Sequence, residues 1–227
     1  PVGEMTRFTR PDGEKAPAYH ADPDLGSKAP GVVVIQEWWG INAQMKGIAD
    51  RLADEDFRVL VPDLYRGRLA ADADEANHMM GDLDWPDALH QDVQGAVNHL
   101  LNTGSPQVAV LGFCMGGALA IAAGVHTHGL DCAVCFYGIP PKELADPKDI
   151  RVPMLFHFAT DDDWCDAEAV AQLKVELEAV EAETIVEIYP DTEHAFMNEA
   201  RPEVYDRDAA RIAWDRSIAF LRENLLT

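Results

Sequence analysis

Short apolar runs rich in β-branched residues recur along the chain, and most of them do not alternate with polar positions. Continuous runs of this kind are typical of strands that are buried on both faces of a parallel sheet. We predict six such strands, at residues 31–37, 58–63, 107–113, 132–137, 153–158 and 184–189.

Between most of these runs, apolar residues recur three or four positions apart, as they do in amphipathic helices. Strands that alternate with helices indicate βαβ units, and therefore an α/β fold with a mostly parallel, doubly wound sheet flanked by helices. The turn-rich residues 1–30 predict a hairpin or edge strands ahead of the main sheet. We expect helices at residues 42–56, 85–102, 115–125, 167–182 and 202–224.

The segment 65–84 interrupts this rhythm, because it is rich in Ala and Asp and has no clean period. Long irregular connections at the carboxyl end of a sheet often shape a pocket. A length of 227 residues suits a single α/β domain. We therefore expect one domain over residues 1–227, with 65–84 as a pocket-shaping loop.

The charge balance narrows the range of partners. Forty acidic residues against eighteen basic ones give a formal net charge of −22, which repels nucleic acids and anionic membranes. The 48% hydrophobic content is that of a globular protein with a sizeable core. The acidity fits either a high-salt environment or an ordinary acidic protein, and we expect a small-molecule substrate and a monomer or small homo-oligomer.

The four cysteines, at positions 114, 132, 135 and 165, do not follow a zinc-binding spacing. Free thiols in a reducing compartment are the simpler interpretation. The chain has no apolar run of membrane-spanning length, and its first residues lack the apolar core of a signal peptide. We expect a cytoplasmic protein without a metal or another cofactor.

The sharpest chemical signal is Gly112-Phe113-Cys114-Met115-Gly116, where a predicted strand ends and a predicted helix begins. It has the pattern of a nucleophile elbow, with Cys114 in the place usually held by serine. The two glycines suit the tight turn, and a helix N-terminus stabilises a thiolate. The motif alone is equally compatible with a glycine-rich turn around a buried structural cysteine.

A nucleophile on such a scaffold requires an acid and then a histidine later in the chain. Three aspartates, Asp161 to Asp163, follow one predicted strand, and His194 follows the last one. Both places lie beyond the carboxyl ends of strands, where open α/β sheets bind their ligands. We expect His194 to be functional, although a lone histidine is more often a surface residue.

Glu37, Trp38 and Trp39 end the first long apolar run. In this topology the loop at that position supplies one backbone N–H of an oxyanion hole, and the residue after the nucleophile supplies the other. Trp38 and Met115 are the expected donors. Apolar surroundings would raise the pKa of Glu37 and suit it to hold a proton, unless it is a solvated residue at a strand end.

Taken together, these motifs resemble the dienelactone hydrolase (carboxymethylenebutenolidase) family, which has the α/β-hydrolase fold. The resemblance extends over nearly the whole chain, through GVVVIQEWWGIN, VPDLYRG, GFCMGG, FHFATDD and EHAF. It implies a Cys114, Asp162 and His194 triad that hydrolyses lactones or esters through an acyl-enzyme, as in aromatic compound degradation. It also implies that Glu37 bonds the resting thiol and takes its proton once substrate binds.

Two positions depart from the family pattern, because Ala195 and Asn198 stand where a serine and a carboxylate-binding arginine are expected. Arg66, Arg68 and Arg201 are the arginines that could replace it. Without such an anchor, we expect neutral or larger esters and lactones to be preferred over small anionic ones. Other candidates for substrate contact are Trp39, His78, Met79, Met80 and Asn198.

Alternative functions are weaker. A serine esterase is excluded because the chain has no Gly-x-Ser-x-Gly. A redox role for Cys132 and Cys135 is disfavoured because the pair lies within an apolar strand. A carboxylesterase or thioesterase with a neutral substrate, and a non-catalytic ligand-binding relative, remain open.

Overall fold

The computed structural model describes residues 2–226 and contains one eight-stranded sheet. The strand order is β1-β2-β4-β3-β5-β6-β7-β8. The first two strands form an antiparallel hairpin, β2 pairs antiparallel with β4, and all later pairings are parallel. The strands are β1 (Glu4–Thr9), β2 (Lys15–Ala21), β3 (Gly31–Ile35), β4 (Arg58–Pro62), β5 (Val108–Phe113), β6 (Cys132–Phe136), β7 (Met154–Asp161) and β8 (Thr184–Glu193).

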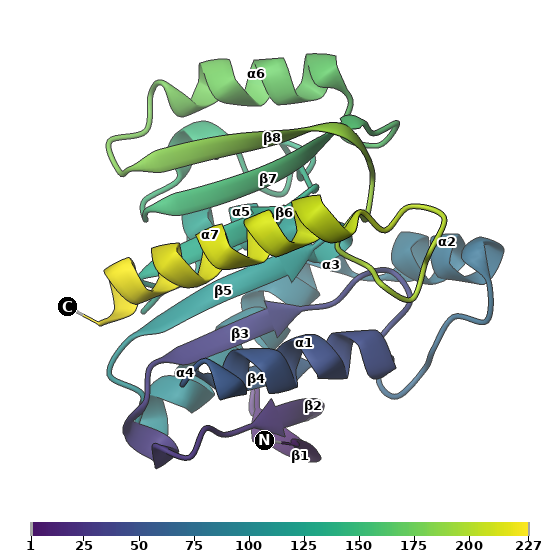
Figure 1. Cartoon of the computed structure of the whole chain (residues 1–227). Coiled ribbons are helices and arrows are strands. Elements are labelled where there is room, and N and C mark those ends of the chain that lie inside the picture. The colour runs from purple at the N-terminus through teal and green to yellow at the C-terminus, as the bar shows by residue number, and fades with distance from the viewer. Residues whose placement is uncertain (1, 227) are drawn as a thin grey trace.

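Helices cover both faces of this sheet, as Figure 1 shows: α1 and α7 lie on the near face, and α4 and α5 on the far face. The α-helices are α1 (Ala43–Asp54), α2 (Ala73–Asp82), α3 (Trp85–Asp87), α4 (Gln94–Asn102), α5 (Met115–His126), α6 (Ala167–Leu177) and α7 (Arg207–Leu225). A π-helical segment, η2 (Ala88–Val93), joins α3 to α4, and the 3₁₀ turns are η1 (Gly26–Lys28) and η3 (Pro147–Asp149).

The expected α/β architecture is confirmed, and the six strands β3 to β8 lie where the apolar runs predicted them. All residues of β3, β4, β5 and β6 are buried, because helices cover both faces of the sheet. This burial explains why their sequences are continuously apolar instead of alternating. The N-terminal hairpin is present as β1 and β2.

Several helical regions differ from the expectation: the helix expected at 85–102 is divided into α3, η2 and α4, and α6 ends at Leu177 instead of 182. The segment 65–84, expected to be irregular, contains α2, whose first turn is capped by the Asp72 carboxylate at 2.9 Å from the Glu75 nitrogen. Helix α7 begins at Arg207, because the Asp206 carboxylate accepts a hydrogen bond from the Ala209 N–H at 3.0 Å. Among the described helices, none combines the length and apolar character needed to cross a bilayer.

Candidate active site

Cys114 occupies the sharp turn between β5 and α5. Its backbone has a φ of 61° and a ψ of −120°, an uncommon conformation for a residue other than glycine. A Cβ atom on Gly112 would collide with the Gly116 carbonyl, and one on Gly116 would collide with the Ile35 carbonyl. The two glycines therefore allow β3, β5 and α5 to meet closely enough to hold the sulfur at the cavity wall.

Asp162 and His194 meet beside this turn. The Nδ1 atom of His194 lies 2.6 Å from Oδ2 of Asp162. The other carboxylate oxygen, Oδ1, accepts hydrogen bonds from the backbone N–H groups of Trp164 at 2.7 Å and Cys165 at 2.9 Å. Asp162 is buried, whereas the neighbouring aspartates 161 and 163 are exposed.

The surroundings of His194 favour its protonated form. Burial lowers the pKa of His194, but hydrogen bonds to Asp162 and Cys114 and the charges of both groups outweigh burial and raise the pKa to about 10. Two aromatic rings meet the imidazole edge-on, Tyr137 at 4.9 Å and Trp164 at 5.4 Å between ring centroids. With Nδ1 engaged by Asp162, the other ring nitrogen, Nε2, is left for Cys114.

Glu37 is buried next to these groups, as the sequence predicted, with 2% of its surface exposed. Burial raises its pKa, against opposing effects of His194, Asn198, Arg201 and Tyr137. The Asn198 amide donates to Oε2 at 3.0 Å, and the Tyr137 hydroxyl donates to Oε1 at 3.5 Å. Within the described chain, Glu37 is therefore bonded to these two residues instead of to the Cys114 thiol.

Two backbone donors remain available near Cys114. In residues 2–226, neither the Trp38 N–H nor the Met115 N–H donates a hydrogen bond to another protein group. Trp38 follows β3 and lines the same cavity as Cys114, while Met115 is the first residue of α5. This pair has the chain positions from which an oxyanion could be held.

The cavity in front of Cys114 has a volume of about 210 Å³. Its wall combines the reactive side chains with apolar and aromatic groups and one guanidinium. It is lined by Glu37, Trp38, Asn77, Met80, Cys114, Trp164, His194, Ala195 and Arg201.

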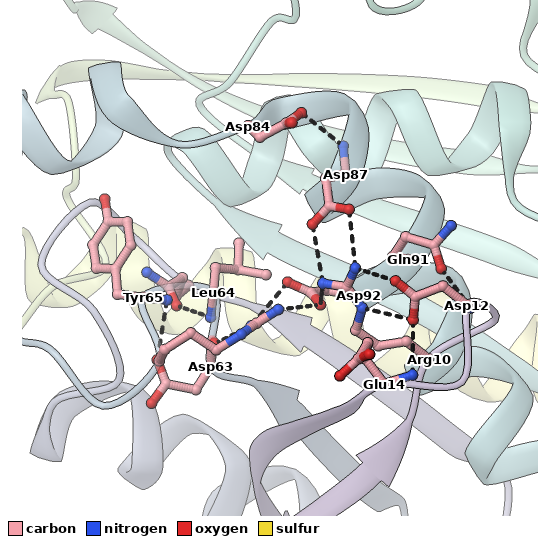
Figure 2. A network of polar contacts seen from close by, with 12 residues as sticks. Arg10, Asp12, Glu14, Asp63, Leu64, Tyr65, Asp84, Asp87, Gln91 and Asp92 are labelled. Carbon is pink, nitrogen blue, oxygen red and sulfur yellow. Dashed lines mark hydrogen bonds and ion pairs between the residues drawn. The ribbon is translucent and has the colours of Figure 1, made fainter.

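Arg66 is not free to serve as a substrate anchor. Its guanidinium forms two hydrogen bonds with the Asp92 carboxylate, at 2.8 and 3.1 Å. Asp92 is buried and also accepts a hydrogen bond from the Arg10 guanidinium, which in turn donates to the Asp87 carboxylate (Figure 2). This network ties the N-terminal hairpin to the helices after residue 84, so Arg66 has a structural partner.

The other substrate candidates divide between the cavity and its surroundings. Arg201 and Met80 line the cavity, whereas Arg68 and Met79 line a separate hollow. The His78 ring is exposed and bonds the Asp74 carbonyl at 2.8 Å, outside the cavity lining.

Trp39 and Asn198 support the cavity wall from behind. The Trp39 ring packs edge-on against Trp38, with centroids 5.5 Å apart, and the Arg201 guanidinium lies 5.7 Å from the Trp39 ring centroid. Asn198 is 1% exposed and contacts Glu37, so its partner is a protein carboxyl group instead of a substrate.

Three residues of the site were not predicted. Asn77 shares a face of α2 with Met80, three positions later, in a segment where the sequence predicts no helix. Trp164 lies two residues after Asp162, in the loop that follows β7, and packs edge-on against His194. A large aromatic residue so close to the expected acid was a sequence signal for a cavity-wall residue. Tyr137 ends a predicted buried strand and looks like an ordinary core residue in the sequence.

Comparison with known proteins gives consistent matches over almost the full chain. The model of the dienelactone hydrolase family matches residues 16–225. Protein usf of Aquifex pyrophilus is 34% identical, with 99% of this chain and all of that protein aligned. A protein of Aquifex aeolicus named "Putative carboxymethylenebutenolidase" is 31% identical over the same shares of both chains.

A solved structure is also similar. The crystal structure of a "Putative Dienelactone Hydrolase" from Klebsiella pneumoniae superposes with a TM-score of 0.84 and 25% identity. The superposition covers 96% of this chain and 98% of that one.

Proposed function

The chain belongs to the dienelactone hydrolase family and is a hydrolase of ester bonds, and we propose that Cys114 is its nucleophile. In this proposal His194 accepts and returns protons, and Asp162 orients and stabilises the imidazolium. The observation that carries it is the 2.6 Å contact of His194 with Asp162 at the turn that presents Cys114.

The first half of the reaction forms an acyl-enzyme. The Cys114 proton passes to Nε2 of His194, and the thiolate attacks the carbonyl carbon of the ester or lactone. The backbone N–H groups of Trp38 and Met115 bind the oxyanion. When the carbon–oxygen bond breaks, His194 returns the proton to the leaving oxygen and the acyl group remains on sulfur.

The second half releases the acid. A water molecule attacks the thioester carbonyl while His194 takes one of its protons. The second tetrahedral intermediate collapses, and the same proton goes from His194 to the Cys114 sulfur. The raised pKa of His194 supports an imidazolium beside a thiolate, and the N-terminus of α5 stabilises negative charge on the same sulfur.

The cavity wall indicates the substrate. Trp38, Met80 and Trp164 provide an apolar surface for the body of a small ester or lactone. Among residues 2–226, the cavity wall also has one permanent cation, the Arg201 guanidinium. We therefore propose that a substrate carboxylate, where one is present, binds to Arg201, which takes the place of the arginine expected at position 198.

A neutral ester or thioester is the second candidate substrate. It is favoured by the apolar wall and by the Glu203 carboxylate, which engages Arg201 Nε at 3.0 Å. Comparison of a charged and an uncharged ester of equal size distinguishes the two substrates.

The segment 65–84 is proposed to form one side of this cavity in a single-domain enzyme, since α2 contributes Asn77 and Met80 to the wall. A thiol nucleophile and three further unpaired cysteines also favour action in a reducing compartment such as the cytoplasm. The proposed chemistry is tested by the stoichiometric burst of an activated aryl ester in the native chain and its loss in Cys114→Ala.

A further inference from the structure

Tyr137 is buried at the centre of the site although it lines no part of the cavity wall. It follows β6 with a φ of 39°, a left-handed conformation that is unfavourable for a residue other than glycine. Its backbone N–H donates to the His157 carbonyl at 2.7 Å, which anchors this turn to β7. The surrounding packing therefore holds Tyr137 in one strained position.

From this position the Tyr137 side chain contacts two elements of the site. Its hydroxyl donates to Oε1 of Glu37 at 3.5 Å and accepts a hydrogen bond from the Met197 N–H. Its ring meets the His194 imidazole edge-on. Tyr137 thus connects the carboxyl group after β3 with the loop that follows β8.

Asn198 holds the second oxygen of Glu37. Its Oδ1 accepts the Ala200 N–H at 3.0 Å, which directs the amide nitrogen toward Glu37 Oε2 at 3.0 Å. Both carboxyl oxygens therefore face donors on buried, fixed side chains. These two hydrogen bonds fix the carboxyl group in place, and within the described chain neither oxygen is bonded to the Cys114 thiol.

His194, in contrast, is directed at the sulfur, because Nδ1 is bonded to Asp162 and Nε2 is left for Cys114. Other titratable groups also face the sulfur. Burial and the charge of Cys114 raise the pKa of Tyr65 after β4. Burial and the charge of Asp162, followed by those of Cys135 and Cys114, raise the pKa of Cys165 after β7, so both groups stay neutral. The remaining charged groups around the pair are Glu37, Asp162 and Arg201.

We propose that Tyr137 and Asn198 are positioning residues that hold the Glu37 carboxyl away from Cys114, so that the Cys114–His194 ion pair forms before any substrate binds. The proposal rests on the nucleophilic role of Cys114 proposed above. The thiol proton moves from Sγ to Nε2 of His194, and no other group gains or loses one. Activation of the thiol is then a property of the free enzyme.

The test measures thiol ionisation without turnover. The full-length chain, free of substrate, is alkylated with iodoacetamide at a series of pH values, and modification of the Cys114 peptide is followed by mass spectrometry. Cys132, Cys135 and Cys165 are buried and, unlike Cys114, do not line the cavity, so they serve as internal references. The native chain should react at a rate that is already constant around neutral pH, because the thiolate is present there.

Tyr137→Phe keeps the ring but removes the hydroxyl. The freed Glu37 carboxylate can then approach the sulfur, and the midpoint of the alkylation profile should rise by about one pH unit. In a Glu37→Gln background the same substitution should cause no shift, because no carboxylate is left to move. Tyr205→Phe is the matched control outside the catalytic cavity and should leave the midpoint unchanged.

The same double-substitution cycle with Asn198→Ala provides a second test if Tyr137→Phe fails to fold. A native alkylation midpoint near that of an ordinary thiol, about 8.5, would overturn the proposal. Equal shifts with and without the Glu37→Gln substitution would also overturn it, because they would reveal a purely structural role. Ester turnover by Cys114→Ala would instead refute the nucleophilic role of Cys114. Turnover is measured separately from alkylation, so the two failures can be told apart.

Discussion

Asp162 and His194 are 32 residues apart, yet Oδ2 of Asp162 lies 2.6 Å from Nδ1 of His194. The contact exists because β7 and β8 are neighbouring parallel strands whose carboxyl ends meet at one edge of the sheet. β5, which carries Cys114, ends at the same edge. The strand order therefore brings the three side chains of the proposed triad together. The role of Asp162 can be tested by comparing its substitution with the same substitution at the neighbouring aspartates.

Asp162→Asn should leave the fold intact and lower kcat/KM by about a thousandfold or more, because an amide cannot stabilise the imidazolium and favours the wrong tautomer. Asp161→Asn and Asp163→Asn are matched controls and should stay within about threefold of the native chain, since both side chains are exposed. Steady-state hydrolysis of an aryl ester by the three variants provides the comparison. A larger loss of kcat/KM in either control would show that Asp162 is not the acid of the triad.

The free energy of unfolding should fall in mild acid because of His157, which is wholly buried. Its Nε2 donates to Ser217 at 2.9 Å, and its Nδ1 accepts from Tyr189 at 2.8 Å, so the neutral ring is fully bonded. Burial, assisted by Arg216, lowers the pKa of His157 to about 3. The unfolded state binds the proton near pH 6.5 and the folded state does not, so this contribution is complete above pH 6.5 and is lost as pH falls toward 3.

His157→Gln removes this titration and retains a donor and an acceptor. Between about pH 6 and 4 the native chain should lose about 1.4 kcal/mol more stability per pH unit than the variant. Urea unfolding of both proteins at several pH values gives the two slopes. Parallel slopes would mean that His157 is not the group that titrates.

Strands β3 to β6 could be predicted closely because each of them is buried on both faces and so leaves a continuous apolar run. The elbow could be predicted because its Gly-x-Cys-x-Gly pattern is local in the sequence, although the contact that requires a glycine at position 116 is with the Ile35 carbonyl of β3. Helix α2 was missed because it is short and buries only Ala76 and Met79, which are too few apolar positions to show a helical period in the sequence.

Side chains with partners that are distant in the chain were harder to assign. Asn198 lies 161 residues from Glu37, and Arg66 lies 26 residues from Asp92. The sequence offered both residues as substrate contacts because their internal partners have no local signal. Arg201 could be named as a candidate, but only the folded loop after β8 shows that it lines the cavity.

Arg201→Gln tests the substrate proposal. Loss of the guanidinium should raise KM for a carboxylate-bearing ester by about tenfold, equivalent to about 1.4 kcal/mol, and leave an uncharged ester of equal size within about twofold. Arg68→Gln is the matched control, since Arg68 lines a different hollow. Equal effects on both substrates would remove Arg201 from carboxylate recognition and favour a neutral natural substrate.

The central claim is that the acyl group is carried by Cys114. Rapid acid quenching during turnover of an activated aryl ester, followed by peptide mass spectrometry, locates the acyl group directly. We expect a single acyl adduct on the peptide that contains Cys114, and neither adduct nor turnover in a folded Cys114→Ala variant. Sustained turnover by that variant, or an adduct on another residue of the native chain, would contradict the account.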